Sequence, residues 1–204
     1  MSIYLYENDL PSDLVLSGDL AIDTETMGLD LHRDNLCLIQ ISTGDGNAHL
    51  VQFKDRQYDC PNLKTLLANT ETEKLFHYAR FDIAAIQKYL DVNCGPVFCT
   101  KIASKLCRTY TDKHGLRNLV KELLDIDLDK QQQASDWGTD SLSEKQQIYA
   151  ANDVLYLHKL RDILKSRLTR ENRLEIAQAC FDFLPSRVAL DLEGWPEHDI
   201  FAHL

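Results

Sequence analysis

The chain has 204 residues, 44% of them hydrophobic, which suffices for one well-buried core and is short for two ordinary domains. Its net charge of −10 argues against the basic face by which proteins usually hold long nucleic acids, so a nucleic-acid partner has to be short or held locally. No window approaches the ~18 consecutive apolar residues of a membrane span, and acids occupy the N-terminus where a signal peptide would be basic, so we expect a cytoplasmic protein with no membrane partner.

Apolar runs bounded by turn residues predict four strands in the first part of the chain. They lie at residues 3–6, 20–25, 36–43 and 48–53. The sequence GDGN at 44–47 is typical of a hairpin turn between the last two. The pattern therefore predicts an antiparallel meander.

After Pro61 helical periodicity alternates with short strands. The pattern predicts helices at 62–69, 81–90 and 101–110, and strands at 74–78 and 96–100. Later helices are expected at 116–124, along one stretch over 143–168, and within 171–185, whereas 127–143 reads as a loop that borders a site. We expect an α/β fold in one domain, residues 1–204, with a mixed sheet flanked by helices and a helical C-terminal segment.

Two acids stand one residue apart in the expected strand at 20–25. Asp23 and Glu25 project from the same face, because strand side chains alternate. Carboxylates held this close repel, and a divalent cation is the usual remedy. The pair alone is a weak signal, since a strand end or an exposed edge also accepts two acids.

Two further acids can complete such a site. Asp82 stands where a strand gives way to a helix, although a helix N-terminus favours an acid for electrostatic reasons alone. Asp153 lies on a helix four residues after Tyr149, so both share one face, as a simple surface hydrogen bond would also require. Together with Asp23 and Glu25 they make an oxygen-rich site suited to Mg²⁺ or Mn²⁺, and two such ions support phosphoryl displacement.

Basic residues gather in one segment of this acidic chain, between residues 101 and 121. On a helix, Lys101, Lys105 and Arg108 would share one face. The segment is interpreted either as a local grip for nucleic acid or as an ordinary solvated helix face.

Three motifs resemble those of the DEDDy 3′→5′ exonucleases, which have a ribonuclease H-like fold. They are DTET at 23–26, HYARFD at 77–82 and YAANDVLYL at 149–157, and residues 114–138 resemble the stretch before the third motif in the ribonuclease D branch. The similarity spans about residues 15–165, followed by a C-terminal helix and tail over 166–204. The chain departs from ribonuclease D in having no long helical extension after the third motif and in reading WGTDSLS at 137–143. It is most similar to the nanoRNase C group, which degrades dinucleotides.

The resemblance implies residue roles and a reaction. Asp23, Glu25, Asp82 and Asp153 match the ligands of two divalent cations, Mg²⁺ or Mn²⁺, and Tyr149 matches the tyrosine that orients the attacking water. The implied activity is a two-metal-ion 3′→5′ exoribonuclease that hydrolyses short single-stranded RNA, preferentially dinucleotides, to nucleoside 5′-monophosphates. Alternatives are a general exonuclease for longer RNA or DNA and, against the intact acids, a silent RNA-binding module.

Candidate substrate contacts follow the same resemblance. Leu29 matches the apolar wedge that such enzymes place against the terminal base, although ordinary core packing also explains it. His77 and Arg80 flank Asp82 and are predicted to meet a phosphate or a terminal hydroxyl, and a satisfied core histidine is the alternative for His77.

A dinucleotide specialist also needs a group that caps the 5′ phosphate. Lys113, His114 and Arg117 are one candidate set, and the tail over 193–204 is another. The large apolar residues Trp195 and Phe201 in that tail, with Leu204, are unusual for a terminal segment, and docking on another protomer explains them. The resemblance implies a homo-oligomer, an octameric ring, assembled through the C-terminal helix and tail.

Overall fold

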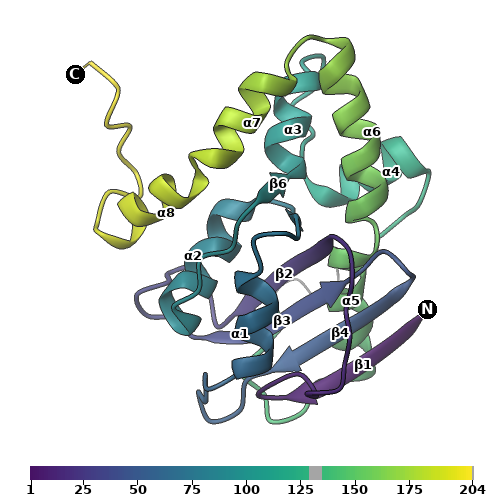
Figure 1. Ribbon diagram of the computed structural model, residues 1–204, viewed down its shortest axis with the longest axis vertical. Coiled ribbons are helices and arrows are strands. Elements are labelled where there is room, and N and C mark those ends of the chain that lie inside the picture. The colour runs from purple at the N-terminus through teal and green to yellow at the C-terminus, as the bar shows by residue number, and fades with distance from the viewer. Residues whose placement is uncertain (129–134, 204) are drawn as a thin grey trace.

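A six-stranded mixed sheet forms the centre of the computed structural model, which describes residues 1–128 and 135–203 (Figure 1). The strands are β1 (Ser2–Glu7), β2 (Leu20–Thr26), β3 (Leu36–Ser42), β4 (Asn47–Gln52), β5 (Lys74–Phe76) and β6 (Val97–Cys99). Their order is β1-β4-β3-β2-β5-β6. All six strands expected from the sequence are present in the described residues.

The meander expected from the sequence is correct for β2, β3 and β4, which pair antiparallel, with β3 and β4 joined across residues 44–47. It is wrong for β1, which runs parallel to β4 at the edge of the sheet. Residues 8–19 carry the chain from β1 across to β2, and this long connection frees β1 from the antiparallel direction that a tight hairpin imposes.

Eight helices lie in the described residues. They are α1 (Pro61–Ala68), α2 (Ala79–Leu90), α3 (Thr100–Cys107), α4 (Leu116–Leu124), α5 (Glu144–Leu155), α6 (Leu157–Arg170), α7 (Leu174–Asp182) and α8 (Leu184–Leu192). None of them has the length and apolar character needed to cross a membrane. Part of the expected loop, residues 129–134, lies outside the described residues, and so does Leu204.

Two helix expectations need correction. The single stretch over 143–168 is two helices, because Tyr156 has φ −107° and ψ −5° and breaks the regular path between α5 and α6. The expected last helix ends at Asp182, and a further helix, α8, begins next to Pro185, a residue that the first turn of a helix accepts.

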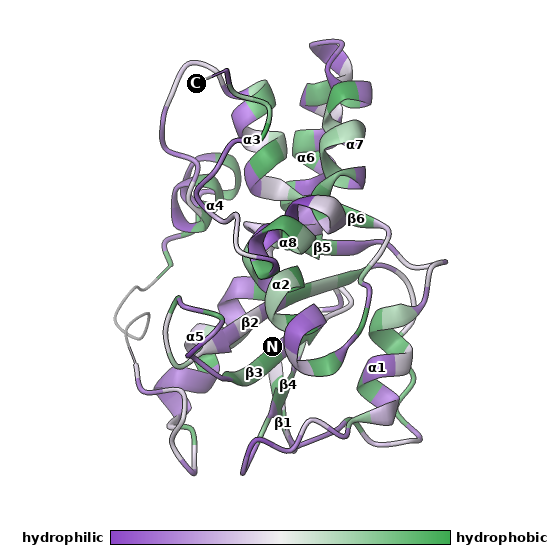
Figure 2. Cartoon of the chain, turned by 90° about the vertical axis from the view of Figure 1, so that its left-hand side faces the viewer, coloured by the Kyte–Doolittle hydropathy of each residue, from purple (hydrophilic) through white to green (hydrophobic). Residues whose placement is uncertain are grey.

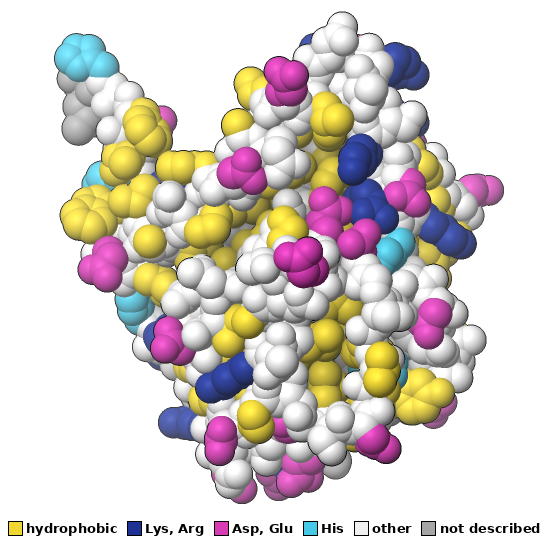
Figure 3. Space-filling model, viewed as in Figure 1, with side chains coloured by type: hydrophobic (Ala, Val, Ile, Leu, Met, Phe, Trp, Pro, Cys, Tyr) yellow, Lys and Arg dark blue, Asp and Glu magenta, His cyan; other side chains and the backbone are white. Residues whose placement is uncertain are grey.

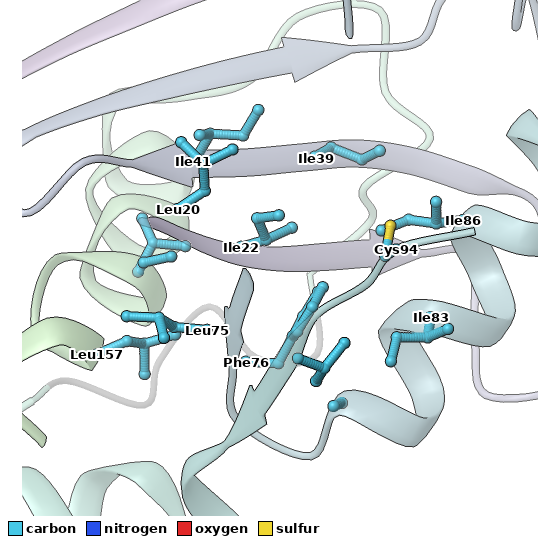
Figure 4. Packing of buried hydrophobic residues seen from close by; sticks show 14 of the residues in the cluster. Leu20, Ile22, Ile39, Ile41, Leu75, Phe76, Ile83, Ile86, Cys94 and Leu157 are labelled. Atoms are coloured by element: carbon cyan, nitrogen blue, oxygen red, sulfur yellow. The ribbon is translucent and has the colours of Figure 1, made fainter. Parts of the chain in front are cut away.

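Helices cover both faces of the sheet. Figure 2 shows α5 on one side of the strands and α1 on the other. Buried aliphatic side chains from both the sheet and the helices form the core, and Figure 4 shows Ile22 and Ile39 of the strands near Ile83 and Ile86 of α2. The later helices α3, α4, α6 and α7 gather beyond the β6 side of the sheet (Figure 1).

The basic face expected on the helix at 101–110 is incomplete. Helix α3 ends at Cys107, and Arg108 leaves the helical path with φ −114° and ψ 58°. Its side chain is fully buried, pairs with Glu122 of α4, and donates to Ser104 Oγ at 2.8 Å. Arg108 is therefore a structural link between α3 and α4.

Candidate active site

The first two acids of the site are set by the pairing of β2 with β3. Asp23 faces Gln40 across the ladder, and Gln40 Nε2 lies 3.3 Å from Asp23 Oδ2. The register shifts directly after Glu25, which is the last regularly paired residue before the strand ends. Asp23 and Glu25 thus project side by side at the end of a rigid central strand, as their spacing predicts.

Helix α5 brings the third acid to this pair. One carboxylate oxygen each from Asp23, Glu25 and Asp153 lie within 4.8 Å of one another. The helix starts at a capping box, in which Ser143 Oγ accepts from the Gln146 amide at 3.3 Å and the Gln146 side chain accepts from the Ser143 amide at 3.0 Å. This cap fixes where α5 begins and hence which residues face the sheet.

Tyr149 lies one turn before Asp153 on the same helix, and both residues line the same pocket. The centroid of the Tyr149 ring lies 6.0 Å from that of Trp137, which follows the undescribed part of the loop. Burial and then the nearby carboxylates raise the pKa of Tyr149, so its hydroxyl keeps its proton at neutral pH. In the cation-free chain the Tyr149 hydroxyl is therefore a hydrogen-bond donor that can orient a neighbouring group.

The fourth acid, Asp82, is held from the other side of β2. It lies in the first turn of α2, after Tyr78, which has φ +73°. Its Oδ1 accepts two hydrogen bonds from Thr24, at 3.0 Å from the amide and at 2.8 Å from Oγ1. Asp82 is not part of the three-acid cluster, and repulsion from Asp23 contributes to the rise in its pKa. Asp23 is therefore close both to the pair Glu25 and Asp153 and to Asp82.

All four carboxyls resist ionisation in the cation-free chain. Burial raises the pKa of Asp23 to about 7, and burial followed by repulsion from Asp23, Asp153 and Asp82 raises that of Glu25 to about 10. The pKa values of Asp82 and Asp153 are also raised, first by burial and then by Asp23. Crowded carboxylate oxygens, buried at Asp82 and partly buried at the other three acids, fit hard divalent cations such as Mg²⁺ or Mn²⁺, whose charge offsets both causes.

A pocket of about 640 Å³ surrounds these acids. Eight of the site residues expected from the sequence line it: Asp23, Glu25, Leu29, His77, Asp82, Arg117, Tyr149 and Asp153. Leu29 is 86% exposed, so core packing does not explain it. His77 is largely enclosed, and burial followed by the charge of Lys101 lowers its pKa to about 3.

Three expected substrate contacts are not among the residues that line this pocket. Arg80 makes a bidentate ion pair with Asp191 of α8, at 2.6 and 2.7 Å. His114 Nδ1 lies 2.8 Å from Ser104 Oγ, and the carbonyl of Lys113 accepts from Arg108 at 2.9 Å. Arg80 and His114 are thus bonded to side chains of the protein itself.

The pocket also includes residues that the sequence did not single out as part of the site. Lys101 lies with Nζ 4.2 Å from the centroid of the Tyr78 ring, and both residues line the pocket. Trp137 is 3% exposed, and its indole Nε1 has no hydrogen-bond partner among the described residues. The basic segment and the WG dipeptide can be recognised in the sequence. Their closeness to the acids cannot, because it depends on how α3 and the segment around Trp137 pack against the sheet.

Comparisons with known proteins agree with this geometry. Residues 6–169 match the family model described as 3′-5′ exonuclease. Ribonuclease D of Acidiphilium cryptum is 32% identical over 156 residues, which are 76% of this chain and 39% of that protein. Ribonuclease D of Bartonella henselae is 33% identical over 157 residues, with 77% and 38% covered. The chain therefore spans about two fifths of the length of these relatives.

Solved structures extend the similarity to the whole chain. Brucella melitensis NrnC bound to pGG is 52% identical, with a TM-score of 0.96 and 100% of both chains covered. NrnC with bound Mg²⁺ gives 51% identity, a TM-score of 0.95 and the same coverage. Escherichia coli RNase D gives 25% identity and a TM-score of 0.72, covering 83% of this chain and 44% of that one.

These findings confirm the fold class and the family predicted from the sequence, including the ribonuclease H-like mixed sheet with helices on its faces and at its C-terminal end. The matched span of 6–169 contains all three motifs. The chain belongs to the 3′–5′ exonuclease family, in the ribonuclease D-like DEDDy branch, where it is a protein of the NrnC, or nanoRNase C, type.

Proposed function

We propose that this chain is a two-metal-ion 3′→5′ exoribonuclease that hydrolyses short RNA, preferentially dinucleotides, to nucleoside 5′-monophosphates. The observation that carries the proposal is the meeting of Asp23, Glu25 and Asp153 within 4.8 Å, in a pocket that Asp82 and Tyr149 also line. Oxygen donors in this arrangement suit the two-metal chemistry of phosphodiester hydrolysis.

The proposed roles follow from the position of each side chain. Asp23, Glu25, Asp82 and Asp153 would hold the cations, with Asp23 between the other acids. Bound there, divalent cations would supply Lewis-acid stabilisation of the charge that develops on the phosphate oxygens. The Tyr149 hydroxyl, which keeps its proton, orients the attacking water. Water adds to phosphorus, the bond to the 3′ oxygen breaks, and that oxygen leaves with a proton.

The preference for dinucleotides is supported by three features. The chain carries a net charge of −10 and so offers little general attraction to long nucleic acids. Leu29 projects from the segment between β2 and β3 into the pocket, where an apolar side chain can pack against a terminal base. NrnC, which is 52% identical along the whole chain, was solved with pGG bound.

Cationic side chains within the pocket are candidates for the 5′ phosphate. Lys101 and Arg117 line it from α3 and α4, and they are its two lysine or arginine residues in the part of the chain that the structure describes. We assign the phosphate cap to this pair, since His114 faces Ser104. Arg80 stays a prediction as a substrate contact, and its pairing with Asp191 gives it a structural role as well.

The proposed enzyme is a cytoplasmic homo-oligomer, an octamer in the NrnC-like arrangement, built from single-domain protomers. The exposed apolar side chains of the C-terminal part support assembly: Ile176, Phe183, Trp195, Ile200 and Phe201. Fractionation of cells would test the location, with the protein expected among cytoplasmic proteins.

The direct test of the proposed activity is a time course with 5′-labelled RNAs of two, three and seven nucleotides, with Mg²⁺ or Mn²⁺. We expect the dinucleotide to disappear far faster than the longer chains, and Asp23→Ala and Glu25→Gln to abolish turnover. Glu71→Gln, an exposed acid outside the pocket, is the matched control and should keep the parent rate. Stepwise shortening of the seven-mer at an equal or higher rate would instead identify a general exonuclease.

A further inference from the structure

His77 presents one ring nitrogen to the protein and leaves the other available to the active-site pocket. The residue follows β5 and forms part of the pocket wall. Its Nδ1 lies 2.9 Å from Oγ1 of Thr100, the fully buried first residue of α3. No hydrogen bond to Nε2 is formed within residues 1–128 and 135–203. The polar atom that His77 can offer to a ligand is therefore Nε2.

The hydrogen bonds of Thr100 determine where the imidazole proton lies. Thr100 Oγ1 donates to the backbone carbonyl of Phe76 at 3.0 Å, and a carbonyl can only accept. A hydroxyl has one proton, so Thr100 has to accept from His77. The imidazole proton is consequently on Nδ1, and Nε2 carries a lone pair.

A neutral His77 with this tautomer cannot recognise a phosphate. Burial and then the charge of Lys101 lower its pKa to about 3, so the ring is uncharged at neutral pH. Nε2 then accepts hydrogen bonds only, and an ionised phosphate has no proton to donate. Of the two partners expected for His77 from the sequence, phosphate or hydroxyl, the neutral ring with its proton on Nδ1 favours the hydroxyl.

We propose that His77 Nε2 accepts a hydrogen bond from a ribose hydroxyl of the bound nucleotide, which makes His77 a specificity-determining residue. The inference rests on the proposed exonuclease function and concerns the same pocket. Every RNA nucleotide carries this donor, whichever base it has. The 2′-hydroxyl would let His77 distinguish RNA from DNA, and the 3′-hydroxyl would let it recognise the chain end.

Two substitutions separate the two nitrogens of the ring. In His77→Asn, the side-chain amide can keep the bond to Thr100 but offers no acceptor at the position of Nε2. In His77→Gln, the longer side chain can place an acceptor near that position. The glutamine variant is therefore the matched partner of the asparagine variant, and thermal unfolding of both reports whether the fold is kept.

The experiment compares kcat/KM for three dinucleotides with the same bases: all-ribose, 2′-deoxy at the 3′ nucleotide, and 3′-deoxy at the 3′ nucleotide. We expect the parent to prefer all-ribose over one deoxy analogue by about tenfold or more, as for the loss of a partner to a buried polar atom. His77→Asn should bring that ratio close to one, and His77→Gln should restore much of it. The analogue affected identifies the hydroxyl.

The proposal is overturned if His77→Asn keeps the parent's ratios for both analogues. Failure of the proposed function is a different result, in which the parent cleaves no dinucleotide with either cation. Dissociation constants for the same three ligands, measured with His77 and with His77→Asn in a Glu25→Gln background, test the contact without requiring turnover. Equal ratios in those two proteins would also overturn it.

Discussion

Burial and mutual repulsion act in the same direction on the pocket carboxyls, because both favour the protonated form. An ordinary Glu has a pKa of 4.5, whereas that of Glu25 in the folded, cation-free chain is raised to about 10. For Asp23 the change is from 3.8 to about 7. Between these values the folded state binds protons that the unfolded state has lost, so the free energy of unfolding falls as pH rises.

We therefore expect Glu25→Gln to raise the melting temperature of the cation-free protein at pH 8, because the amide is neutral without the proton that Glu25 has to take up when the chain folds. The gain should shrink towards pH 4.5, where the unfolded chain also begins to hold the proton. Thermal unfolding in EDTA across this range measures both effects, with Glu71→Gln as control. A gain that does not change with pH would contradict the assigned cause. Added Mg²⁺ should stabilise the parent more than Glu25→Gln.

Thr24 holds the Asp82 carboxylate in place, because its amide and its hydroxyl both donate to Asp82 Oδ1. Thr24→Val removes the hydroxyl bond and keeps the shape, and we expect it to weaken cation-dependent activity by about 10- to 100-fold, as is typical for groups that orient a metal ligand. Thr24→Ser keeps the hydroxyl and should stay near the parent. Activity titrated against Mg²⁺ makes the measurement, and equal curves for both variants would count against this role.

Local patterns predicted which acids share a face, whereas the grouping of all four acids was implied by the resemblance to the exonuclease motifs. Asp23 and Glu25 share a strand face, and Tyr149 and Asp153 share a helix face, so spacing alone places each pair. The contribution of Lys101 was not predictable, because it depends on how α3 packs next to β5. Local periodicity says which residues share a face and does not say which distant faces meet.

For helices and strands too, local signals were predicted correctly and long-range ones were not. The hairpin at 44–47 and helix α4 were correct, since turn residues and apolar spacing are local signals. The break at Tyr156 has no glycine or proline to announce it, so α5 and α6 read as one helix. The parallel direction of β1 follows from a pairing across residues 8–46, which alternation within the strand does not encode.

Arg108 ties the end of α3 to α4 through its pair with Glu122, and both helices contribute residues to the pocket. Its fully buried side chain also donates to the Lys113 carbonyl at 2.9 Å. Arg108→Ala leaves these partners unpaired, and we expect a loss of about 3 kcal/mol in the free energy of unfolding. Lys121→Ala, which breaks exposed ion pairs on α4, should leave the free energy of unfolding close to that of the parent.

Urea unfolding of the two variants and the parent measures this difference under identical conditions. Each of the two variants loses one positive charge in the region of α3 and α4, so the change in net charge is the same in both. Similar midpoints for Arg108→Ala and Lys121→Ala would show that the contacts of the buried Arg108 side chain contribute no more than exposed ion pairs do.

In the whole molecule, the C-terminal part is held to the body at α8 and carries exposed apolar side chains beyond it. Arg80 and Arg187 both pair with Asp191, which fixes α8 against α2. Beyond α8 the chain projects from the body, and apolar side chains gather over this region in Figure 3. The aromatic rings of Phe183 and Phe201 lie 6.0 Å apart, and Phe201 is still 75% exposed. A surface of this kind favours contact with another protein.

We expect size-exclusion chromatography with light scattering to give a mass well above that of one chain for the parent. The double variant Ile200→Ser with Phe201→Ser should shift the mass towards the monomer, because it removes exposed apolar area from the projecting segment. Val15→Ser, at an exposed apolar position far from α8 in the sequence, is the control. A monomeric parent, or a double variant with the parent's mass, would contradict assembly through this segment. Since one chain supplies Asp23, Glu25 and Asp153, the dissociated variant should still bind Mg²⁺.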